Sequence, residues 1–226
     1  MENNETKTRE AQYQYMINGG WQLCKFGMMS GQVWYDDPKR LGFVLSRYKF
    51  VSKMLSGVNK VLEIGCADAF ASRIVAESVG SLTAVDFDQI FIENATGTYE
   101  QKWPIKFLVH DITTSPLNEK FDAAYSIDVL EHITREQEPF FISNIVDSLS
   151  DDGVCLIGSP SQESQLYASK CSREGHVNCK TANELKSLMK RYFKNVFIFS
   201  MNDEVVHTGF DQMAHYRFAL ACGPLR

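Results

Sequence analysis

From about residue 60 onwards, short apolar segments alternate with helical patterns. We expect helices over 70–79, 89–96 and 137–149, and strands at 61–64, 82–85, 105–109, 121–126 and 154–158. Apolar strands that alternate with helices are typical of a mostly parallel sheet covered on both faces. Because crossovers between parallel strands are right-handed, few topologies remain, and the doubly wound α/β sheet is the leading one.

The last part of the chain departs from this alternation. A helix is expected over 181–192, where Thr181 and Glu184 form a capping-box pattern. Two strands follow at 196–200 and 216–222 without a helix between them, so we expect them to pair antiparallel at one edge. The predicted fold is therefore an α/β, doubly wound, mostly parallel seven-stranded sheet with an antiparallel edge strand. It occupies a catalytic domain over 58–226.

The segment before this domain has a different character. A long helical pattern covers 38–55, and Pro38 suits the first turn of a helix. Aromatic residues precede it, and we interpret Trp34 and Tyr35 as one wall of a pocket. We therefore predict a helical lid or extension over 1–57. The alternative is that the helix over 38–55 simply covers the outer face of the sheet.

Composition limits the partners of the chain. Its 226 residues carry a formal net charge of −5 and a sequence pI of about 5.6. This balance argues against a general nucleic-acid binder, which needs clustered lysine and arginine. There is no signal-peptide pattern, and no apolar run approaches the roughly 18 residues of a membrane helix. We expect a cytoplasmic protein with six free thiols and a small-molecule substrate, with a homodimer left open.

The turn after the first expected strand has the features of a cofactor site. Gly65 permits a backbone conformation closed to other residues, and the helix that follows directs its N–H groups toward a ligand. The full Gly-x-Gly-x-x-Gly pattern of a pyrophosphate site is missing, because Ala67 and Phe70 stand at its later positions. Glu63 would repel a pyrophosphate but suits a cationic ligand. S-adenosylmethionine carries a sulfonium and an ammonium group, so charge favours it over a dinucleotide.

Acidic residues also follow the next strands. Asp86, with Phe87 beside it, lies 21 residues after Gly65, where a carboxylate accepts the ribose hydroxyls of a bound nucleoside. A carboxylate at Asp111, followed by Ile112, can accept from the exocyclic amine of adenine. A helix cap and a turn residue are the respective alternatives for Asp86 and Asp111. Asp128 ends the fourth strand beside the first, so we expect it to face the reactive end of the cofactor.

Four segments in this order resemble class I S-adenosylmethionine-dependent methyltransferases, in the group related to ubiquinone-type and small-molecule enzymes. They are VLEIGCADAF (61–70), TAVDFD (83–88), HDIT (110–113) and FDAAYSIDVLEHI (121–133). The resemblance implies S-adenosyl-L-methionine as the cofactor. It implies contacts from the residues of the motifs: Glu63, Gly65, Cys66, Ala67, Asp86, Phe87, Asp111, Ile112 and Asp128.

The sequence departs from this family in the turn, since the family usually has glycine where Ala67 and Ala69 stand. A second resemblance concerns 175–210, which is similar to uncharacterised methyltransferases of surface-polysaccharide gene sets. It implies a substrate class only. Together these features predict a methyltransferase that O-methylates a small polar metabolite or sugar, nucleotide-linked or phosphorylated. A non-catalytic cofactor-binding protein of the same fold is the alternative.

A hydroxyl acceptor gains from a general base, most often histidine near neutral pH. His176 ranks first and His132 second, and Asp128 completes the candidate catalytic set. A structural histidine remains the alternative for each. Candidate substrate contacts are aromatic rings that stack on a sugar and arginines that receive a phosphate or carboxylate: Trp34, Tyr35, Tyr167, Arg47 and Arg173.

We expect no metal ion. Cys171, His176 and Cys179 form a C-x4-H-x2-C pattern without a second pair. Glu131 and His132 offer two ligand types, but the sequence does not point to a third. A nicotinamide-dependent oxidoreductase is disfavoured by the missing glycines, by Glu63 and by the final strand pair. A nucleic-acid methyltransferase is disfavoured by the acidic charge balance.

Overall fold

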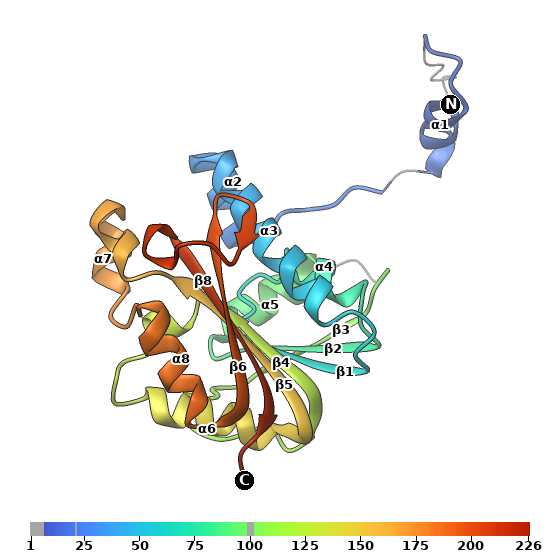
Figure 1. Cartoon of the computed structure of the whole chain (residues 1–226). Helices are drawn as coiled ribbons and strands as arrows, with labels where there is room; N and C mark the ends of the chain where they lie inside the picture. Colours follow the sequence, from blue (N-terminus) through green and yellow to red (C-terminus); the bar gives the residue numbers. More distant parts are fainter. Residues whose placement is uncertain (1–6, 21, 99–101) are drawn as a thin grey trace.

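The computed structural model describes residues 7–20, 22–98 and 102–226. One sheet forms the centre of the molecule, and its strand order is β3-β2-β1-β4-β5-β8-β6-β7 (Figure 1). The parallel strands are β1 (Lys60–Ile64), β2 (Ser81–Asp86), β3 (Ile105–Val109), β4 (Phe121–Ile127) and β5 (Leu149–Pro160). The strand order reverses at β1 and β4, which places a crevice at their carboxyl ends.

The antiparallel part of the sheet is larger than predicted. β8 (Tyr216–Pro224) pairs antiparallel with both β5 and β6 (Phe193–Asn202), which confirms the expected pair. An eighth strand, β7 (Val205–His207), extends the sheet because β6 continues to Asn202 and turns back at Asp203, whose φ is 50°. Three residues are too short a strand to leave a recognisable periodic pattern, so the sequence predicted seven strands.

Helices cover both faces of the sheet. α6 (Glu138–Ser148) and α8 (Ala182–Lys190) bury their apolar sides in one core cluster, with Phe141, Ile145 and Leu188 nearly inaccessible. α3 (Pro38–Met54) and α4 (Ser72–Ala76) share a second cluster through Tyr48 and Val51. α5 (Gln89–Thr98) packs on β2 and β3. The sequence left open whether the helix after Pro38 belongs to a lid or covers the face of the sheet. The structure shows that it packs on the face of the sheet.

The helix expected over 70–79 is much shorter in the structure. Residues 65–71 form turns, in which Ala67 and Ala69 have φ values of 46° and 54°, and such values are incompatible with a right-handed helix. The side chain of Asp68 caps this loop by accepting from the amide of Phe70 at 3.2 Å. The helix begins only at Ser72 and ends at Ala76, because residues 70–71 and 77–78 form turns on either side of it.

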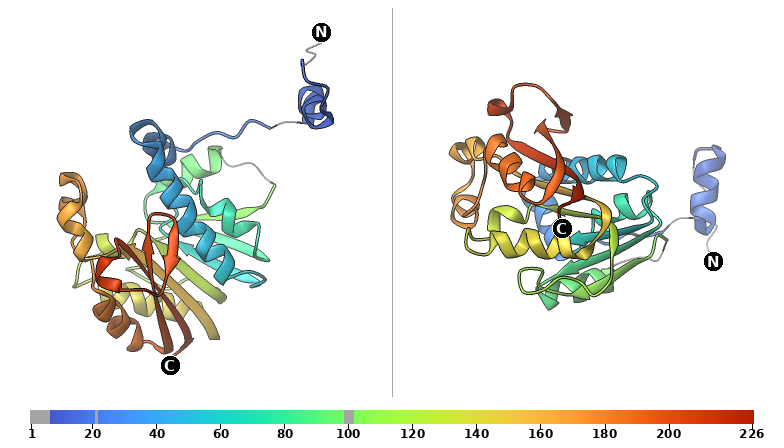
Figure 2. Two further views of the ribbon diagram at one scale, coloured as in Figure 1. Left: turned by 45° about the horizontal axis from the view of Figure 1, so that its top comes forward. Right: turned by 60° about the horizontal axis from the view of Figure 1, so that its bottom comes forward.

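The N-terminal segment divides into two parts. α2 (Met28–Asp36) packs on α3 and is tied to the β1 turn, because the Ser30 amide and hydroxyl donate to Asp68 at 2.6 and 2.8 Å. α1 (Ala11–Tyr15) and the π-helical turn Met16–Gly20 stand away from the body (Figure 2). The lid over 1–57, of which 1–6 and 21 lie outside the described residues, stays a prediction. Within the described segments, no helix combines the length and apolarity needed to cross a membrane.

Candidate cofactor and acceptor site

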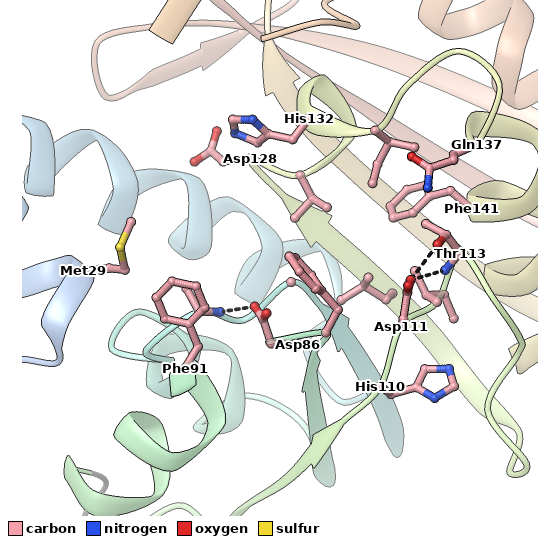
Figure 3. Close-up of a pocket in the computed structure, with 17 residues that line it drawn as sticks. Met29, Asp86, Phe91, His110, Asp111, Thr113, Asp128, His132, Gln137 and Phe141 are labelled. Carbon is pink, nitrogen blue, oxygen red and sulfur yellow. Dashed lines mark hydrogen bonds between the residues drawn. The ribbon is translucent and has the colours of Figure 1, made fainter. Parts of the chain in front are cut away.

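A cavity of about 490 Å³ opens at the carboxyl ends of the central parallel strands (Figure 3). Predicted cofactor residues from four separate motifs contribute to its wall: Gly65, Ala67, Asp86, Phe87, Asp111, Ile112 and Asp128. A second cavity of about 210 Å³ lies on the side of α2 and α3 and includes Cys66. Gly65, Ala67 and Asp128 line both cavities, so the turn after β1 forms their common boundary.

Close packing fixes the conformation of this turn. Gly65 has a φ of 76°, and a Cβ at this position would lie 2.3 Å from Cγ2 of Val129. The amides of Gly65 and Cys66 both donate to the carbonyl of Val85, at 2.8 and 3.1 Å. Ala67 adopts a positive φ although it is not glycine, which costs about 1–2 kcal/mol. This backbone cost explains why the family usually has glycine where Ala67 stands.

Asp86 connects this turn to β2. Its Oδ2 accepts from the amide of Ala67 at 2.9 Å, and its Oδ1 accepts from the amide of Asp88 at 3.0 Å. Both oxygens keep a second lone pair for a ligand. Asp111 forms a local turn in which its Oδ1 accepts from the amide and hydroxyl of Thr113. Asp111 thus has the turn role named as its alternative, whereas the cap of α5 is Asp88, whose Oδ1 accepts from the amide of Ile90. Both Asp86 and Asp111 line the cavity.

Glu63 lies behind the turn rather than on the wall of either cavity in the described part of the chain. Only 1% of its surface is exposed, and Tyr48 donates to its Oε1 at 2.8 Å. Burial raises the pKa of the Glu63 carboxyl to about 7, and the bond from Tyr48 opposes this shift. The Glu63 carboxyl is buried and lines neither of the two cavities described here. Its contact with the cofactor therefore stays a prediction.

Asp128 lines both cavities and has a φ of 60°. Its Oδ2 accepts from Nη1 of Arg47 at 2.6 Å, and the Arg47 guanidinium lies 3.9 Å from the centre of the Tyr216 ring. Opposing effects act on this guanidinium: burial lowers its pKa, but Asp128 and the other acidic neighbours leave it raised overall. Arg47, predicted to contact substrate, is therefore partnered with Asp128 at the pocket border.

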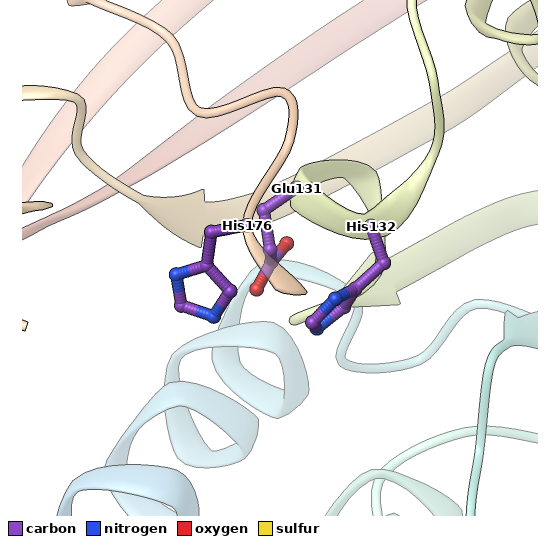
Figure 4. A group of neighbouring side chains, drawn as sticks. All are labelled: Glu131, His132 and His176. Carbon is purple, nitrogen blue, oxygen red and sulfur yellow. The ribbon is translucent and has the colours of Figure 1, made fainter. Parts of the chain in front are cut away.

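Glu131, His132 and His176 form a second group beside Asp128 (Figure 4). The 3-10 turn Leu130–His132 is separated from the end of β4 by two residues and carries the first two residues of this group. Asp128 and His132 line the same cavity. His176 follows α7 (Lys170–Gly175), and its ring meets that of His132 edge to face at 5.2 Å between centres. Burial and the Asp128 charge raise the pKa of the Glu131 carboxyl well above its usual value.

The two predicted bases therefore come together from distant parts of the sequence. His132 lines the larger cavity, and His176 contacts the ring of His132 but lines neither of the two cavities described here. Burial, together with His132, lowers the pKa of His176, which favours its neutral form. Of the C-x4-H-x2-C pattern, Cys171 is exposed and Cys179 is buried, and the metal-capable cluster found in the described segments instead joins His176 to Glu131 and His132.

The other predicted substrate residues lie on the surface. Trp34 stacks on Phe26 with 5.7 Å between ring centres, and Tyr35 and Tyr167 are 84% and 89% exposed. Arg173 is exposed on α7. In the described structure these four residues contribute to neither cavity, so their contacts with an acceptor stay predictions.

Sequence reasoning missed several apolar residues of the larger cavity, namely Met29, Phe91, Val129, Ile133 and Phe141, and the polar Gln137. Phe91 belongs to α5 and Phe141 to α6. Apolar residues of helices are expected in the core, so their sequence pattern gives no signal of a pocket wall. Met29 comes from α2, and only the packing of α2 on the body brings it there.

Comparison with known proteins agrees with this geometry. Residues 61–153 match the protein family described as "Methyltransferase domain". A ubiquinone biosynthesis O-methyltransferase of Rickettsia canadensis is 26% identical over 161 residues, which are 65% of this chain and 65% of that protein. An uncharacterised methyltransferase of Mycobacterium tuberculosis is 36% identical over 78 residues, 34% of this chain and 39% of the relative. The chain thus spans just under two thirds of the ubiquinone-type relatives.

Solved structures share the fold. N-methyltransferase NodS from Bradyrhizobium japonicum WM9, in complex with S-adenosyl-L-homocysteine, has a TM-score of 0.63 and 22% identity over 85% of this chain and 91% of its own. The methyltransferase domain of bacterial CtHen1-C has a TM-score of 0.67 and 14% identity over 81% of this chain and all of its own.

The fold is that of the class I S-adenosylmethionine-dependent methyltransferases, to which the resemblance pointed. Within it, residues 61–153 match the methyltransferase-domain family, and S-adenosylmethionine is the cofactor of this class. The resemblance and the cofactor predicted from the four motifs are thereby confirmed.

Proposed function

We propose that the chain transfers a methyl group from S-adenosylmethionine to an oxygen of a small polar acceptor. The observation that carries this proposal is the cavity lined by all four motif segments at the switch point of the sheet. The acceptor class that we propose is a sugar or similar metabolite, nucleotide-linked or phosphorylated, of the kind used in surface-polysaccharide synthesis. The resemblance of 175–210 supports this class.

Each part of the cofactor has a partner in the proposal. The Asp86 carboxylate accepts the ribose hydroxyls, and Asp111 with Ile112 borders the adenine. The apolar rings of Phe87 and Phe91 flank the nucleoside, because both line the same cavity. The turn at Gly65 holds the methionine end, where the two cavities meet. These assignments direct the methyl group toward Asp128 and His132.

The residues at the methyl end position the acceptor and exclude water. The bound sulfonium supplies the methyl group, and proximity provides much of the rate of an in-line displacement. His132 or His176 holds the proton that the acceptor hydroxyl releases. The low pKa of His176 keeps its imidazole neutral and able to accept a proton near pH 7. Support for an oxygen acceptor comes from relatives named O-methyltransferases, whereas NodS is an N-methyltransferase.

Calorimetric titration with S-adenosylmethionine and S-adenosylhomocysteine tests cofactor binding. We expect one site per chain and at least about tenfold weaker binding in Asp86→Ala, because the ribose contacts and the bond to the Ala67 amide are lost. Glu93→Gln on exposed α5 is the control, and its affinity should match that of the wild type. Absence of heat with either ligand would refute the proposal.

Turnover is tested separately by release of S-adenosylhomocysteine from pools of sugars, sugar nucleotides and phenolic metabolites. We expect turnover with a hydroxyl-bearing acceptor, lost in whichever of His132→Asn and His176→Asn removes the base and retained in part in the other. Cofactor binding without turnover on any pool would favour a non-catalytic protein of the same fold. Turnover only with amines would overturn the assignment to oxygen.

A further inference from the structure

Arg217 is a charged residue in the interior of the molecule. It lies near the start of β8, and only 1% of its surface is exposed. Its cross-strand neighbours, Ser159 on β5 and Ser200 on β6, share its face of the sheet and are small, so they leave room for the guanidinium. A buried charge is costly unless it is paired and hydrogen-bonded. The partners of Arg217 therefore indicate its role.

The guanidinium of Arg217 binds three segments of the chain at once. Its Nη1 donates to Oε2 of Glu163 at 2.7 Å and to the carbonyl of Lys180 at 3.0 Å. Its Nη2 donates to the carbonyl of Asp211 at 2.8 Å. Glu163 and Lys180 lie near the two ends of the loop 161–181, and Asp211 lies in the loop 208–215. We call these two segments the acceptor loops, and one side chain holds them together.

The first acceptor loop reaches the methyl end of the site. Two residues after Glu163, Oε1 of Gln165 lies 2.9 Å from Nδ1 of His176. The ring of His176 contacts that of His132, which lines the larger cavity. The position of Glu163 is therefore transmitted to the cavity wall through two side chains.

The residue before Arg217 supports the other side of the same site. Side chains alternate along a strand, so Tyr216 and Arg217 point to opposite faces of the sheet. The Tyr216 ring lies against the guanidinium of Arg47, which is bonded to Asp128. The start of β8 thus supports Asp128 from one face and the loop of His176 from the other.

Stability alone does not account for the buried charge of Arg217. Replacement of a buried ion pair by apolar side chains of similar volume is often neutral or stabilising. An apolar side chain could fill the space, but a guanidinium offers a planar fork of donors for two carbonyls and a carboxylate. Burial raises the pKa of the Glu163 carboxyl, but the bond from Arg217 leaves this pKa lowered overall, which keeps the pair charged.

We propose that Arg217 and Glu163 are positioning residues for the methyl acceptor, because they fix the acceptor loops relative to the methyl end of the cofactor. In the described structure they line neither cavity of the site, so they act on the acceptor through Gln165 and His176. The cofactor turn follows β1, which β4 and β5 separate from β8 in the sheet. The acceptor space rests on the proposed function, whereas the binding of both loops by one guanidinium does not.

Steady-state turnover separates a positioning role from structural support alone. In Glu163→Ala, whose side chain is 31% exposed in the wild type, we expect kcat/KM for an acceptor found in the pools above to fall by about 10–100-fold. The affinity for S-adenosylmethionine, measured by calorimetry, should match that of the wild type. Glu163→Gln keeps an oxygen that accepts from Arg217 and should recover part of the loss.

Glu119→Ala is the matched control for turnover. It removes the exposed ion pair with Lys106 on β3, far from the acceptor loops in the sheet order, and should keep the wild-type rates. All rates are measured well below the thermal unfolding midpoint of each variant, so that lower stability alone does not change them. An unchanged kcat/KM in Glu163→Ala, or an equal loss of cofactor affinity, would overturn the positioning role.

Amide hydrogen exchange tests the link between the loops without any acceptor. Arg217→Lys replaces the planar fork by a single ammonium, so exchange should become faster in both 161–181 and 208–215 and stay unchanged in 61–70. Unchanged exchange in either loop would overturn the link. If Arg217→Lys does not fold, Glu163→Ala gives the decisive comparison for 161–181. Absence of wild-type turnover with every pool refutes the proposed function alone, and exchange then decides whether Arg217 holds the loops.

Discussion

Replacement of Gly65 by alanine tests the steric account of the cofactor turn. Gly65 has a φ of 76°, and an added Cβ would lie 2.3 Å from Cγ2 of Val129, which is far inside van der Waals contact. Two separate costs follow. Alanine in the left-handed region costs about 1–2 kcal/mol, and overpacking against a neighbour costs about 1–3 kcal/mol. We therefore expect Gly65→Ala to lower the free energy of unfolding by about 2–5 kcal/mol.

A double-mutant cycle separates the two costs. Val129→Ala removes the methyl group that the new Cβ would meet, so in that background Gly65→Ala should cost only the backbone share of about 1–2 kcal/mol. The free energies are measured by urea unfolding, followed by circular dichroism and tryptophan fluorescence to check two-state behaviour. Gly65→Ala should also weaken S-adenosylmethionine binding, because Gly65 borders both cavities.

Gly97→Ala provides the matched control. Gly97 lies in α5, and an added Cβ there meets nothing within 4 Å, so the better helix former should stabilise the chain by about 0.5–1 kcal/mol. An equal cost of Gly65→Ala in the wild-type and Val129→Ala backgrounds would refute the clash with Val129. A total cost below about 1 kcal/mol would refute the backbone reasoning as well.

Three further predictions concern single side chains. The folded pKa of Glu63 is about 7 against an ordinary 4.5, so its contribution to stability is fully present below pH 4.5 and falls by about 3 kcal/mol as the pH rises to 7. Glu63→Gln should remove this fall in urea unfolding at pH 4.5 and 8, and an unchanged pH profile would contradict it. Ala67→Gly relieves a φ of 46° and should leave stability equal or raise it by up to about 1 kcal/mol, whereas a clear loss in thermal unfolding would count against strain there. Thr181→Ala removes the cap on the Glu184 amide and should cost about 1 kcal/mol by the same urea assay, with no change meaning that the box does not contribute.

Much of the fold follows from periodicity. The first four parallel strands and the three longer helices were predicted within two residues at each end, because each segment buries its own apolar pattern. The fifth strand begins at Leu149, five residues earlier than predicted. The helix after β1 was predicted too long at both ends, because residues 70–71 and 77–78 form turns that continue the apolar pattern without being helical. β7 was missed because three residues carry no measurable period.

The cofactor side of the site was also readable from the sequence. Glycine at the turn and carboxylates at strand ends are local requirements, and parallel strands bring their carboxyl ends to the same edge without further information. Gly65, Asp86, Asp111 and Asp128 do line one cavity. Glu63 is the exception. A residue inside a strand faces either the pocket or the core, and Glu63 faces the core, where the hydroxyl of Tyr48 on α3 donates to its carboxylate.

The acceptor side was decided by tertiary structure alone. Met29 reaches the cavity only because α2 is bonded to Asp68, and Arg47 reaches Asp128 across 81 residues of chain. His176 meets Glu131 and His132 because the loop after β5 folds back on the turn after β4. A linear sequence encodes local conformation and burial directly, so it determined the turn, the strands and the methyl donor. Contacts between distant loops depend on the packing of whole elements, and only the folded chain brings His176 to Glu131 and His132.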